Sequence, residues 1–149
     1  MEPKRSEILH GQATDVWTKI QVSQSWKTWA GYAFENICFK HITEIKKALG
    51  LAGISTVHSQ WSSHQEAQID MVIDRPDQCI NLVEEKFCEG EFRVTKEYAE
   101  RLQRKKQLFR EKTKTRKALF TTLITPYGAI EDENYLSAVD NQLTINELF

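Results

Sequence analysis

The sequence has few cysteines and no long apolar run, and each absence argues against a class of protein. Its three cysteines, Cys38, Cys79 and Cys88, show no paired spacing, which argues against a disulfide framework and fits a reducing compartment. No segment approaches the roughly 20 apolar residues that a membrane-spanning helix needs, and the N-terminal stretch is polar rather than signal-like. We expect a soluble, cytoplasmic protein with no membrane partner.

The length and composition of the chain are those of one compact domain. With 149 residues, of which 40% are apolar and 10% aromatic, the chain can bury one good core but is short for two. It contains no internal repeat and no low-complexity tract. A single core therefore has to be built from the segments that show periodic apolar residues.

Helical periodicity appears first over residues 26–49, with Ser25 as a plausible N-cap and Gly50 just past the end. One row of this predicted helix contains Gly31, Glu35 and Cys38, so Glu35 is the only charge among small and apolar neighbours. We expect its carboxylate to be partly buried. Either it is satisfied structurally by a partner, or it belongs to a site.

The rest of the chain predicts strands around a second helix. The residues 75–78, RPDQ, form a turn that is typical of a hairpin between antiparallel strands. The fold class is therefore α/β (α+β), with a central sheet flanked by helices and the core order α-β-β-β-α-β. The predicted strands cover residues 54–61, 67–74, 79–87 and 117–125, and the predicted second helix covers residues 94–113.

A basic block coincides with that second helix. From Arg93 to Lys117 there are 11 lysines and arginines against three glutamates, a local balance of +8. Arg101 and Lys105 lie within it and are candidate nucleic-acid contacts. The block is either a phosphate-binding face or a solvated helix surface, and it needs an independent signal to decide between the two.

Charged residues interrupt the most apolar strands. Strand alternation places Glu84 and Lys86 on one face of the third strand and Glu85 on the other. On the preceding strand, the same alternation places Asp70 on the face of Val72. If this is also the Glu84 face, the hairpin brings Asp70 close to Glu84 and leaves Glu85 pointing away.

Two carboxylates and an ammonium are costly to bury unless they are paired or bound to a metal ion. Mg²⁺, or Mn²⁺, suits Asp70 and Glu84, because a hard cation takes one or two carboxylates together with water and phosphate oxygens. Such a metal lowers the pKa of a bound water, and Lys86 would orient that water and offset charge on a phosphate. The alternative is a salt bridge of Lys86 with Glu84 or Asp70.

These residues resemble the core of the PD-(D/E)XK nuclease superfamily, in which an Asp ends one strand, a Glu/Asp-x-Lys triplet lies on the next and a helical Glu often joins them. The matching stretches are QIDMVIDR, INLVEEKF and GYAFE, which place Asp70, Glu84, Lys86 and Glu35 in these positions. The wider sequence, from about Trp17 to the C-terminus, resembles the C-terminal region of a group of prokaryotic AAA-type ATP-binding proteins.

The resemblance implies a restriction-endonuclease-like fold with a mixed sheet over residues 17–149, after a polar lead-in or linker at 1–16. It implies a divalent metal held by Asp70, Glu84 and a backbone carbonyl beside Glu84, assisted by Glu35. It also implies that Lys96 and Tyr98 contact the substrate. Two features depart from the pattern: Ile69 replaces the motif proline, and the chain has no GxxxxGK phosphate loop.

We therefore expect a divalent-metal-dependent nuclease that hydrolyses DNA phosphodiester bonds. The resemblance implies that it is the C-terminal domain of an AAA-type ATPase or a partner to one, in cis or in trans, and we leave a homodimer open. The alternative is a catalytically inactive domain of nuclease fold that docks nucleic acid or protein for an ATPase.

Other residues have structural interpretations. We interpret Trp26, Trp29 and Trp61 as core or interface anchors rather than base-stacking platforms, because they lie in or beside periodic segments and away from the basic block. Cys38 and His41 are three residues apart and could share a zinc ion, but no second close pair completes four ligands. A buried thiol is the preferred interpretation of Cys38.

Overall fold

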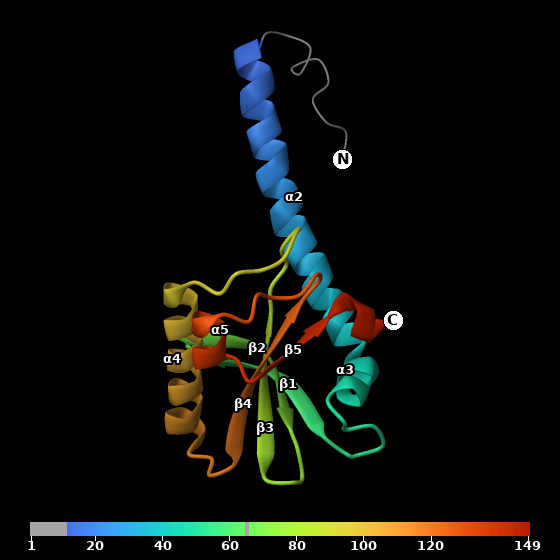
Figure 1. Ribbon diagram of the computed structural model, residues 1–149, viewed down its shortest axis with the longest axis vertical. Helices are drawn as coiled ribbons and strands as arrows, with labels where there is room; N and C mark the ends of the chain where they lie inside the picture. Colours follow the sequence, from blue (N-terminus) through green and yellow to red (C-terminus); the bar gives the residue numbers. More distant parts are fainter. Residues whose placement is uncertain (1–11, 65) are drawn as a thin grey trace.

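The computed structural model describes residues 12–64 and 66–149, with side chains from Ser25 onward. They form a five-stranded mixed sheet in the order β1-β2-β3-β4-β5 (Figure 1). The first three strands are antiparallel, and β3, β4 and β5 are parallel. The strands are β1 Val57–Ser63, β2 Ala67–Asp74, β3 Cys79–Glu85, β4 Ala118–Thr125 and β5 Asn141–Thr144. The expected mixed sheet flanked by helices is confirmed.

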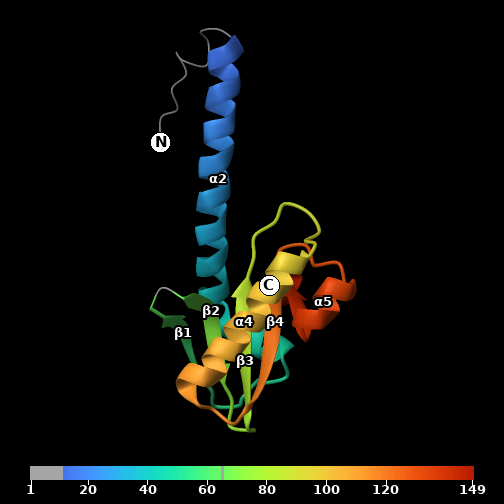
Figure 2. The same ribbon diagram turned by 90° about the vertical axis from the view of Figure 1, so that its left-hand side faces the viewer.

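Helices cover both faces of the sheet (Figures 1 and 2). One face packs against α2 and α3, where Phe34 and Cys38 meet Met71 of β2. The other face packs against α4, where Phe109 meets Val72. The helices are α2 Gln12–Lys40, α3 Ile42–Ala48, α4 Lys96–Thr113 and α5 Glu133–Ala138, with a short 3-10 helix η1 at Ile145–Leu148. The predicted order α-β-β-β-α-β is present, with α5, β5 and η1 added after it.

The first helix differs from its predicted bounds. It begins at Gln12 and runs through Ser25, so the predicted N-cap at Ser25 is wrong. It ends at Lys40, because His41 leaves the helical conformation at φ −108° and ψ 32° before α3 begins. Gly50 follows α3 with φ +77°, as expected for a glycine past a helix end. Of the expected lead-in at residues 1–16, residues 1–11 lie outside the described part of the chain.

The β2–β3 hairpin is confirmed. Asp74 pairs with Ile80 at its closed end, and the main-chain N–H of Arg75 donates to the carbonyl of Cys79 at 3.1 Å. The guanidinium of Arg75 also donates to both carboxylate oxygens of Asp77. These local contacts fix how β3 lies beside β2, and thereby which residues can meet at the open end of the hairpin.

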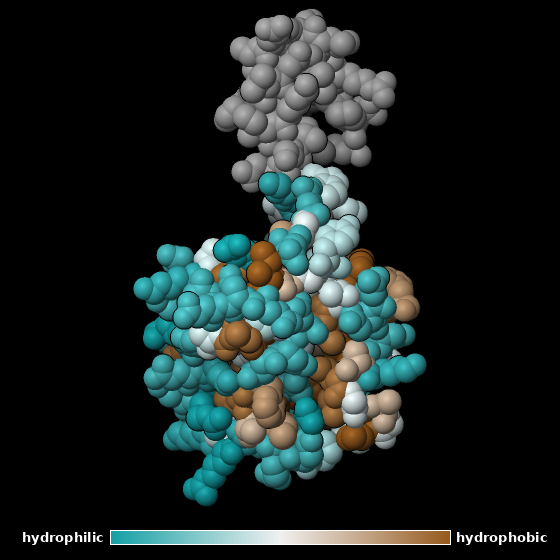
Figure 3. Space-filling model, viewed as in Figure 1, coloured by the Kyte–Doolittle hydropathy of each residue, from teal (hydrophilic) through white to brown (hydrophobic). Residues whose placement is uncertain are grey.

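The second helix matches its predicted range closely. The Oγ1 atom of Thr95 caps it by accepting a hydrogen bond from the N–H of Tyr98 at 3.1 Å. The apolar residues Val94, Tyr98, Leu102 and Phe109 fall on one stripe of the predicted helix. Leu102 and Phe109 of α4 and Val94 just before it are buried, and Tyr98 is partly buried. In the space-filling view, hydrophilic residues cover the α4 side, and apolar residues show between them over the middle of the molecule (Figure 3).

No helix among the described residues is long and apolar enough to cross a bilayer. The longest of these helices, α2, has 29 residues, and charged and polar residues interrupt its sequence.

Candidate functional site

A bulge in β2 determines where Asp70 lies. In the pairing of β1 with β2, Ser59 is opposite Val72 and Trp61 is opposite Ile69. One residue of β1 therefore spans two residues of β2, Asp70 and Met71. As a result Ile69 and Val72 both pack on the α4 side of the sheet, although three positions separate them. Bulges of this kind re-aim side chains.

The bulge turns Asp70 toward the α2 side of the sheet. Its Oδ2 accepts a hydrogen bond from the main-chain N–H of Glu85 at 2.8 Å, and its side chain lines a cavity together with Glu35 and Glu85. The expectation that Glu85 points away from Asp70 is therefore wrong. Regular alternation failed to predict this because it assumed an unbroken β2.

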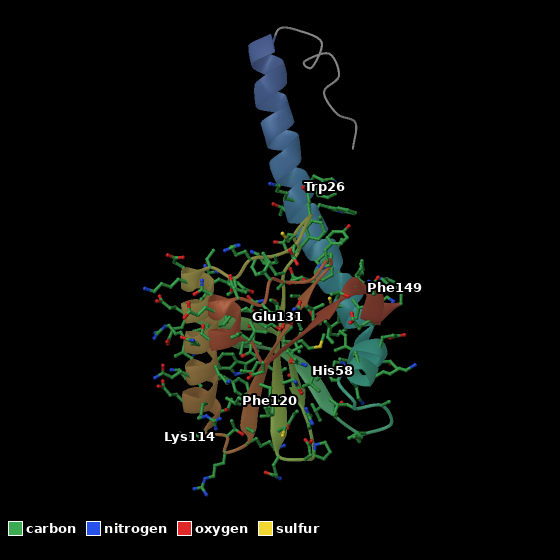
Figure 4. The ribbon with its side chains drawn as sticks, viewed as in Figure 1. Trp26, His58, Lys114, Phe120, Glu131 and Phe149 are labelled. Carbon is green, nitrogen blue, oxygen red and sulfur yellow. The ribbon has the colours of Figure 1, made fainter. Side chains whose placement is uncertain are left out.

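We call Glu35, Asp70 and Glu85 the carboxylate cluster. They come from α2, β2 and β3, and all three are half-buried. The cluster lies where α2 packs against the sheet. Trp26 lies on the same helix (Figure 4), and its ring packs edge-on against Phe87, two residues after Glu85, with 5.7 Å between the ring centroids. The partial burial expected for Glu35 is confirmed, and its neighbours Ala30, Phe34 and Cys38 form the buried row of the helix.

Two adjoining cavities share Glu35 and Glu85. The first is also lined by Lys27, Gly31 and Lys86. The second also contains Asp70, and its remaining wall is formed by Tyr32, Asn36, Phe39, Gln60, Gln68 and Met71. The carboxylates are thus accessible from two sides along the length of α2.

Burial and mutual repulsion dominate the electrostatics of the cluster and favour the protonated form of its carboxyl groups. Burial, reinforced by Asp70 and Glu35, raises the pKa of Glu85 to about 8. Burial also raises the pKa of Asp70, against the hydrogen bond from Glu85 and the charges of Lys105 and Lys86. Burial and the charge of Asp70 raise the pKa of Glu35. The Oε2 atom of Glu85 is buried with no hydrogen-bond partner among the described residues. Such a group either takes up a proton or binds a cation.

The donor set fits a hard divalent cation, because such ions prefer carboxylate oxygens and a buried unpaired oxygen is available. Within residues 12–64 and 66–149, however, no three His, Cys, Asp or Glu side chains are grouped closely enough to hold a metal ion as they stand. Coordination by the carboxylate cluster would therefore require its side chains to move closer together.

Glu84 lies on the opposite face of β3, under α4. Its carboxylate forms a salt bridge with Lys105 at 2.9 Å, with exposed side-chain fractions of 5% for Glu84 and 20% for Lys105. Burial raises the pKa of Glu84 to about 7, and Lys105 opposes the shift. The charge of Asp70 adds to the rise in pKa, so Asp70 is near enough to act on Glu84, as the hairpin predicts, although Glu84 lies outside the two cavities. Glu84 takes Lys105 as its partner rather than Lys86. Lys105, a candidate nucleic-acid contact, is engaged inside the fold.

Lys86 follows the last residue of β3, is exposed, and lines the first cavity together with Glu35 and Glu85. Its Nζ is 6.0 Å from the centre of the Tyr98 ring, and the guanidinium carbon of Arg101 is 5.7 Å from that centre. Tyr98 is half-buried against Phe92, with ring centroids 5.3 Å apart. Of the predicted substrate contacts, Lys96 and Arg101 are exposed.

The sequence interpretation missed three residues of the second cavity, Glu85, Tyr32 and Phe39. No signal in the sequence marks Glu85, because only the bulge in β2 brings Asp70 to it. Trp29 and Tyr32 lie on an exposed face of α2 rather than in the core. The core interpretation is therefore wrong for Trp29 and also for Trp26, which is 46% exposed, whereas Trp61 packs against the core at Phe109. A role of Trp26 or Trp29 at an interface stays a prediction.

The interpretation of Cys38 as a buried thiol is confirmed. Cys38 is a fully buried free thiol, while Cys79 and Cys88 are free and partly buried. Burial raises the pKa of Cys38 well above its usual range, and Glu85, Asp70 and Glu35 raise it further. The Nδ1 atom of His41 donates to the carbonyl of Ile37 at 2.8 Å.

Comparison with known proteins gives a family but no characterised relative. The model of the family DUF234, described as archaeal and bacterial proteins of unknown function, matches residues 1–115. A search of curated proteins and a search of solved structures each returned no match.

Proposed function

Because the chain belongs to the DUF234 family of archaeal and bacterial proteins of unknown function, we propose an activity from its own site: hydrolysis of DNA phosphodiester bonds with a divalent metal ion. One observation carries the proposal. The carboxylate cluster converges on open cavities with Lys86 on the wall, and none of its members forms a salt bridge with a described lysine, arginine or histidine.

Asp70 would hold the metal ion, with Glu35 and Glu85 beside it. In this proposal Glu85 takes the place that the motif assigns to Glu84, because Glu84 is already neutralised by Lys105. Bound Mg²⁺ or Mn²⁺ supplies a Lewis acid and lowers the pKa of water. The hydrogen bond from the N–H of Glu85 holds Asp70 in a fixed orientation, which is the preorganisation that a catalytic site requires.

Lys86 would offset negative charge on the phosphate that is attacked. Lys86 and Arg101 lie 6.0 Å and 5.7 Å from the centre of the Tyr98 ring, so Tyr98 has a cation from the end of β3 and a cation from α4 beside it. Preorganised cations of this kind stabilise charge that develops during phosphoryl transfer. The exposed Lys96 and the other basic side chains of α4 would bind the DNA backbone beyond them.

The likeness to the C-terminal region of AAA-type ATP-binding proteins supports a further part of the proposal. The domain would act together with an ATPase, in cis or in trans, because the chain itself has no GxxxxGK loop.

The test is cleavage of plasmid and oligonucleotide DNA by the purified chain in Mg²⁺ and in Mn²⁺. Asp70→Asn and Lys86→Ala should each lower the rate by at least about 100-fold. Glu66→Gln is the matched control, since Glu66 is an exposed acid that lies 3.7 Å from Lys112 and lines neither cavity of the carboxylate cluster. Absence of cleavage with both metals, or equal cleavage by the Asp70 and Lys86 variants, would refute the activity.

A second candidate function has one observation in its favour. Since the described side chains form no ready metal-binding group, the domain could be a non-catalytic dock for nucleic acid or for a protein that works with an ATPase. Titration with Mn²⁺ by calorimetry separates the two functions. The enzyme requires binding that Asp70→Asn abolishes, whereas the docking domain binds DNA without metal at the cluster.

A further inference from the structure

Three aromatic side chains on one side of α2 are exposed to solvent. We call Trp29, Tyr32 and Phe39 the aromatic face; their exposed fractions are 65%, 66% and 54%. Steps of three and seven residues place them along one side of a helix, opposite the buried row of Ala30 and Phe34. Exposing several large aromatic rings side by side is unfavourable in free energy, and such a contiguous apolar surface is typical of a ligand- or partner-binding site.

The aromatic face leads directly to the carboxylate cluster. Tyr32 and Phe39 line the same cavity as Glu35, Asp70 and Glu85. A further hollow contains Trp29 and Tyr32 together with Lys40. The hollow of Trp29 shares Tyr32 with the cavity of the carboxylates, and that cavity shares Glu35 and Glu85 with the cavity of Lys27 and Lys86. The three hollows therefore adjoin one after another along α2, with the carboxylates in the middle.

The chemistry of these hollows suits an extended polyanion that carries flat apolar groups. Lysines stand at both ends, Lys27 and Lys86 at one and Lys40 at the other, where they can neutralise phosphates. The divalent cation of the proposed function would offset the carboxylates between them. The rings between the lysines offer planar surfaces on which nucleobases stack, whatever their sequence. In a duplex the faces of the bases are covered by neighbouring base pairs, so only unpaired bases can use such a surface.

A second copy of the chain fits this face less well. Packing another apolar helix over Trp29 and Tyr32 would also cover Glu35 and Asn36, which lie beside them on α2. Buried polar and charged groups without partners cost free energy. The ring of Phe39 packs edge-on against His58 of β1, with ring centroids 5.9 Å apart.

We propose that the aromatic face stacks the unpaired bases of single-stranded nucleic acid and so presents a single-stranded substrate to the carboxylate cluster. As a substrate assignment this rests on the proposed nuclease function. The binding site itself is carried by the exposed rings, their common cavity with the carboxylates and the flanking lysines.

The test measures binding separately from cleavage. Fluorescence anisotropy is recorded with a labelled single-stranded DNA oligonucleotide and with a blunt duplex of the same sequence, in Ca²⁺, a hard cation that takes oxygen ligands. The wild-type chain should bind the single strand more tightly than the duplex. Trp29→Ala and Tyr32→Ala should each weaken single-strand binding by about 5- to 150-fold, while Trp29→Phe keeps a ring and most of the affinity.

Tyr127→Ala is the matched control, because Tyr127 is 64% exposed but lines none of these three cavities. Its affinity should equal that of the wild type. Circular dichroism verifies that α2 remains folded in each variant, and since the substituted side chains are exposed, folding should be retained.

The proposal is overturned if Trp29→Ala and Tyr32→Ala bind the single strand as the wild type does, or if duplex and single strand bind equally. It is also overturned if sedimentation shows a dimer that Trp29→Ala converts to a monomer, since the face would then belong to a second copy. Ring-dependent binding without cleavage in Mg²⁺ or Mn²⁺ would refute the nuclease activity and leave the single-strand site standing.

Discussion

The main-chain N–H of Glu85 donates a hydrogen bond of 2.8 Å to Oδ2 of Asp70, just beyond Met71 and Val83, the last residues of the β2–β3 ladder. This contact joins the two strands where their regular pairing has ended. It also places the glutamate of the carboxylate cluster one position later than the motif predicts. Glu84, which the motif assigns to the metal, forms a salt bridge with Lys105 on the opposite face.

Metal binding should distinguish the two adjacent glutamates. Glu85→Gln removes a carboxylate from the cluster and should lower the affinity for Mn²⁺ at least about tenfold. Glu84→Gln should retain that affinity, because Glu84 lies on the Lys105 side. Isothermal titration calorimetry measures both affinities. It is done at about pH 8, where protons compete less with the metal ion for the carboxylates. Loss of binding only in Glu84→Gln would restore the assignment made from the motif.

The free energy of unfolding should decrease as the pH rises through the window set by the buried glutamates. Burial raises the pKa of Glu85 from 4.5 to about 8 and that of Glu84 from 4.5 to about 7. Between these values the folded protein binds more protons than the unfolded chain, so stability is lost with increasing pH.

Glu85→Gln should remove the contribution of Glu85 to the pH dependence of the free energy of unfolding. The variant should be more stable than the wild type at about pH 8, by on the order of 1–3 kcal/mol, and the difference should shrink toward about pH 5. Urea unfolding at the two pH values measures it. A variant that is less stable than the wild type at the higher pH would show that ionised Glu85 is not destabilising.

Lys105→Met should destabilise the fold by about 1–3 kcal/mol, because it leaves the buried carboxylate of Glu84 without its cation. Lys106→Met is the control, since Lys106 and Asp140 are 3.7 Å apart with exposed side-chain fractions of 37% and 43%. That exposed pair should contribute no more than about 0.5 kcal/mol. Equal effects of the two substitutions in urea would contradict a special role for the Glu84–Lys105 pair.

Replacing each of two glycines by alanine should change the stability of the protein in opposite directions. Gly50 has φ +77° after α3, so Gly50→Ala should cost about 1 kcal/mol. Gly31 lies inside α2, and a Cβ there would meet no atom within 4 Å. Gly31→Ala should therefore stabilise the protein by about 0.5–1 kcal/mol. Thermal unfolding monitored by circular dichroism would show the melting temperature falling in the first variant and rising in the second.

DNA binding should depend on salt through the exposed residues of α4. Lys96→Gln should reduce the slope of log affinity against log salt concentration by about 1, because one phosphate contact is lost. Lys105→Gln should leave the slope unchanged, since Lys105 is held by Glu84 inside the fold. Anisotropy titrations over a range of salt concentrations measure both slopes, and a reduced slope for Lys105→Gln would make it a phosphate contact after all.

The elements with strong local signals could be predicted from the sequence. The turn at residues 75–78 set the β2–β3 hairpin, and the spacing of Val94, Leu102 and Phe109 identified α4 with its buried side. The short segments β5 and α5 carry weaker signals, because four- and six-residue elements offer little periodicity. The passage of α2 through Ser25 was missed because a plausible N-cap residue also occurs inside helices.

The sequence by itself determined that acids lie at the ends of two apolar strands and beside a helix carrying Glu35, since these positions follow from residue order and period. The tertiary structure decided which acids meet. A single extra residue in β2, opposite β1, changed the direction of Asp70. Glu85 then lies against α2 and Glu84 against α4, on opposite faces of the sheet. The physical reason is that a bulge depends on how two strands pair, and strand pairing is not encoded in the period of either strand alone.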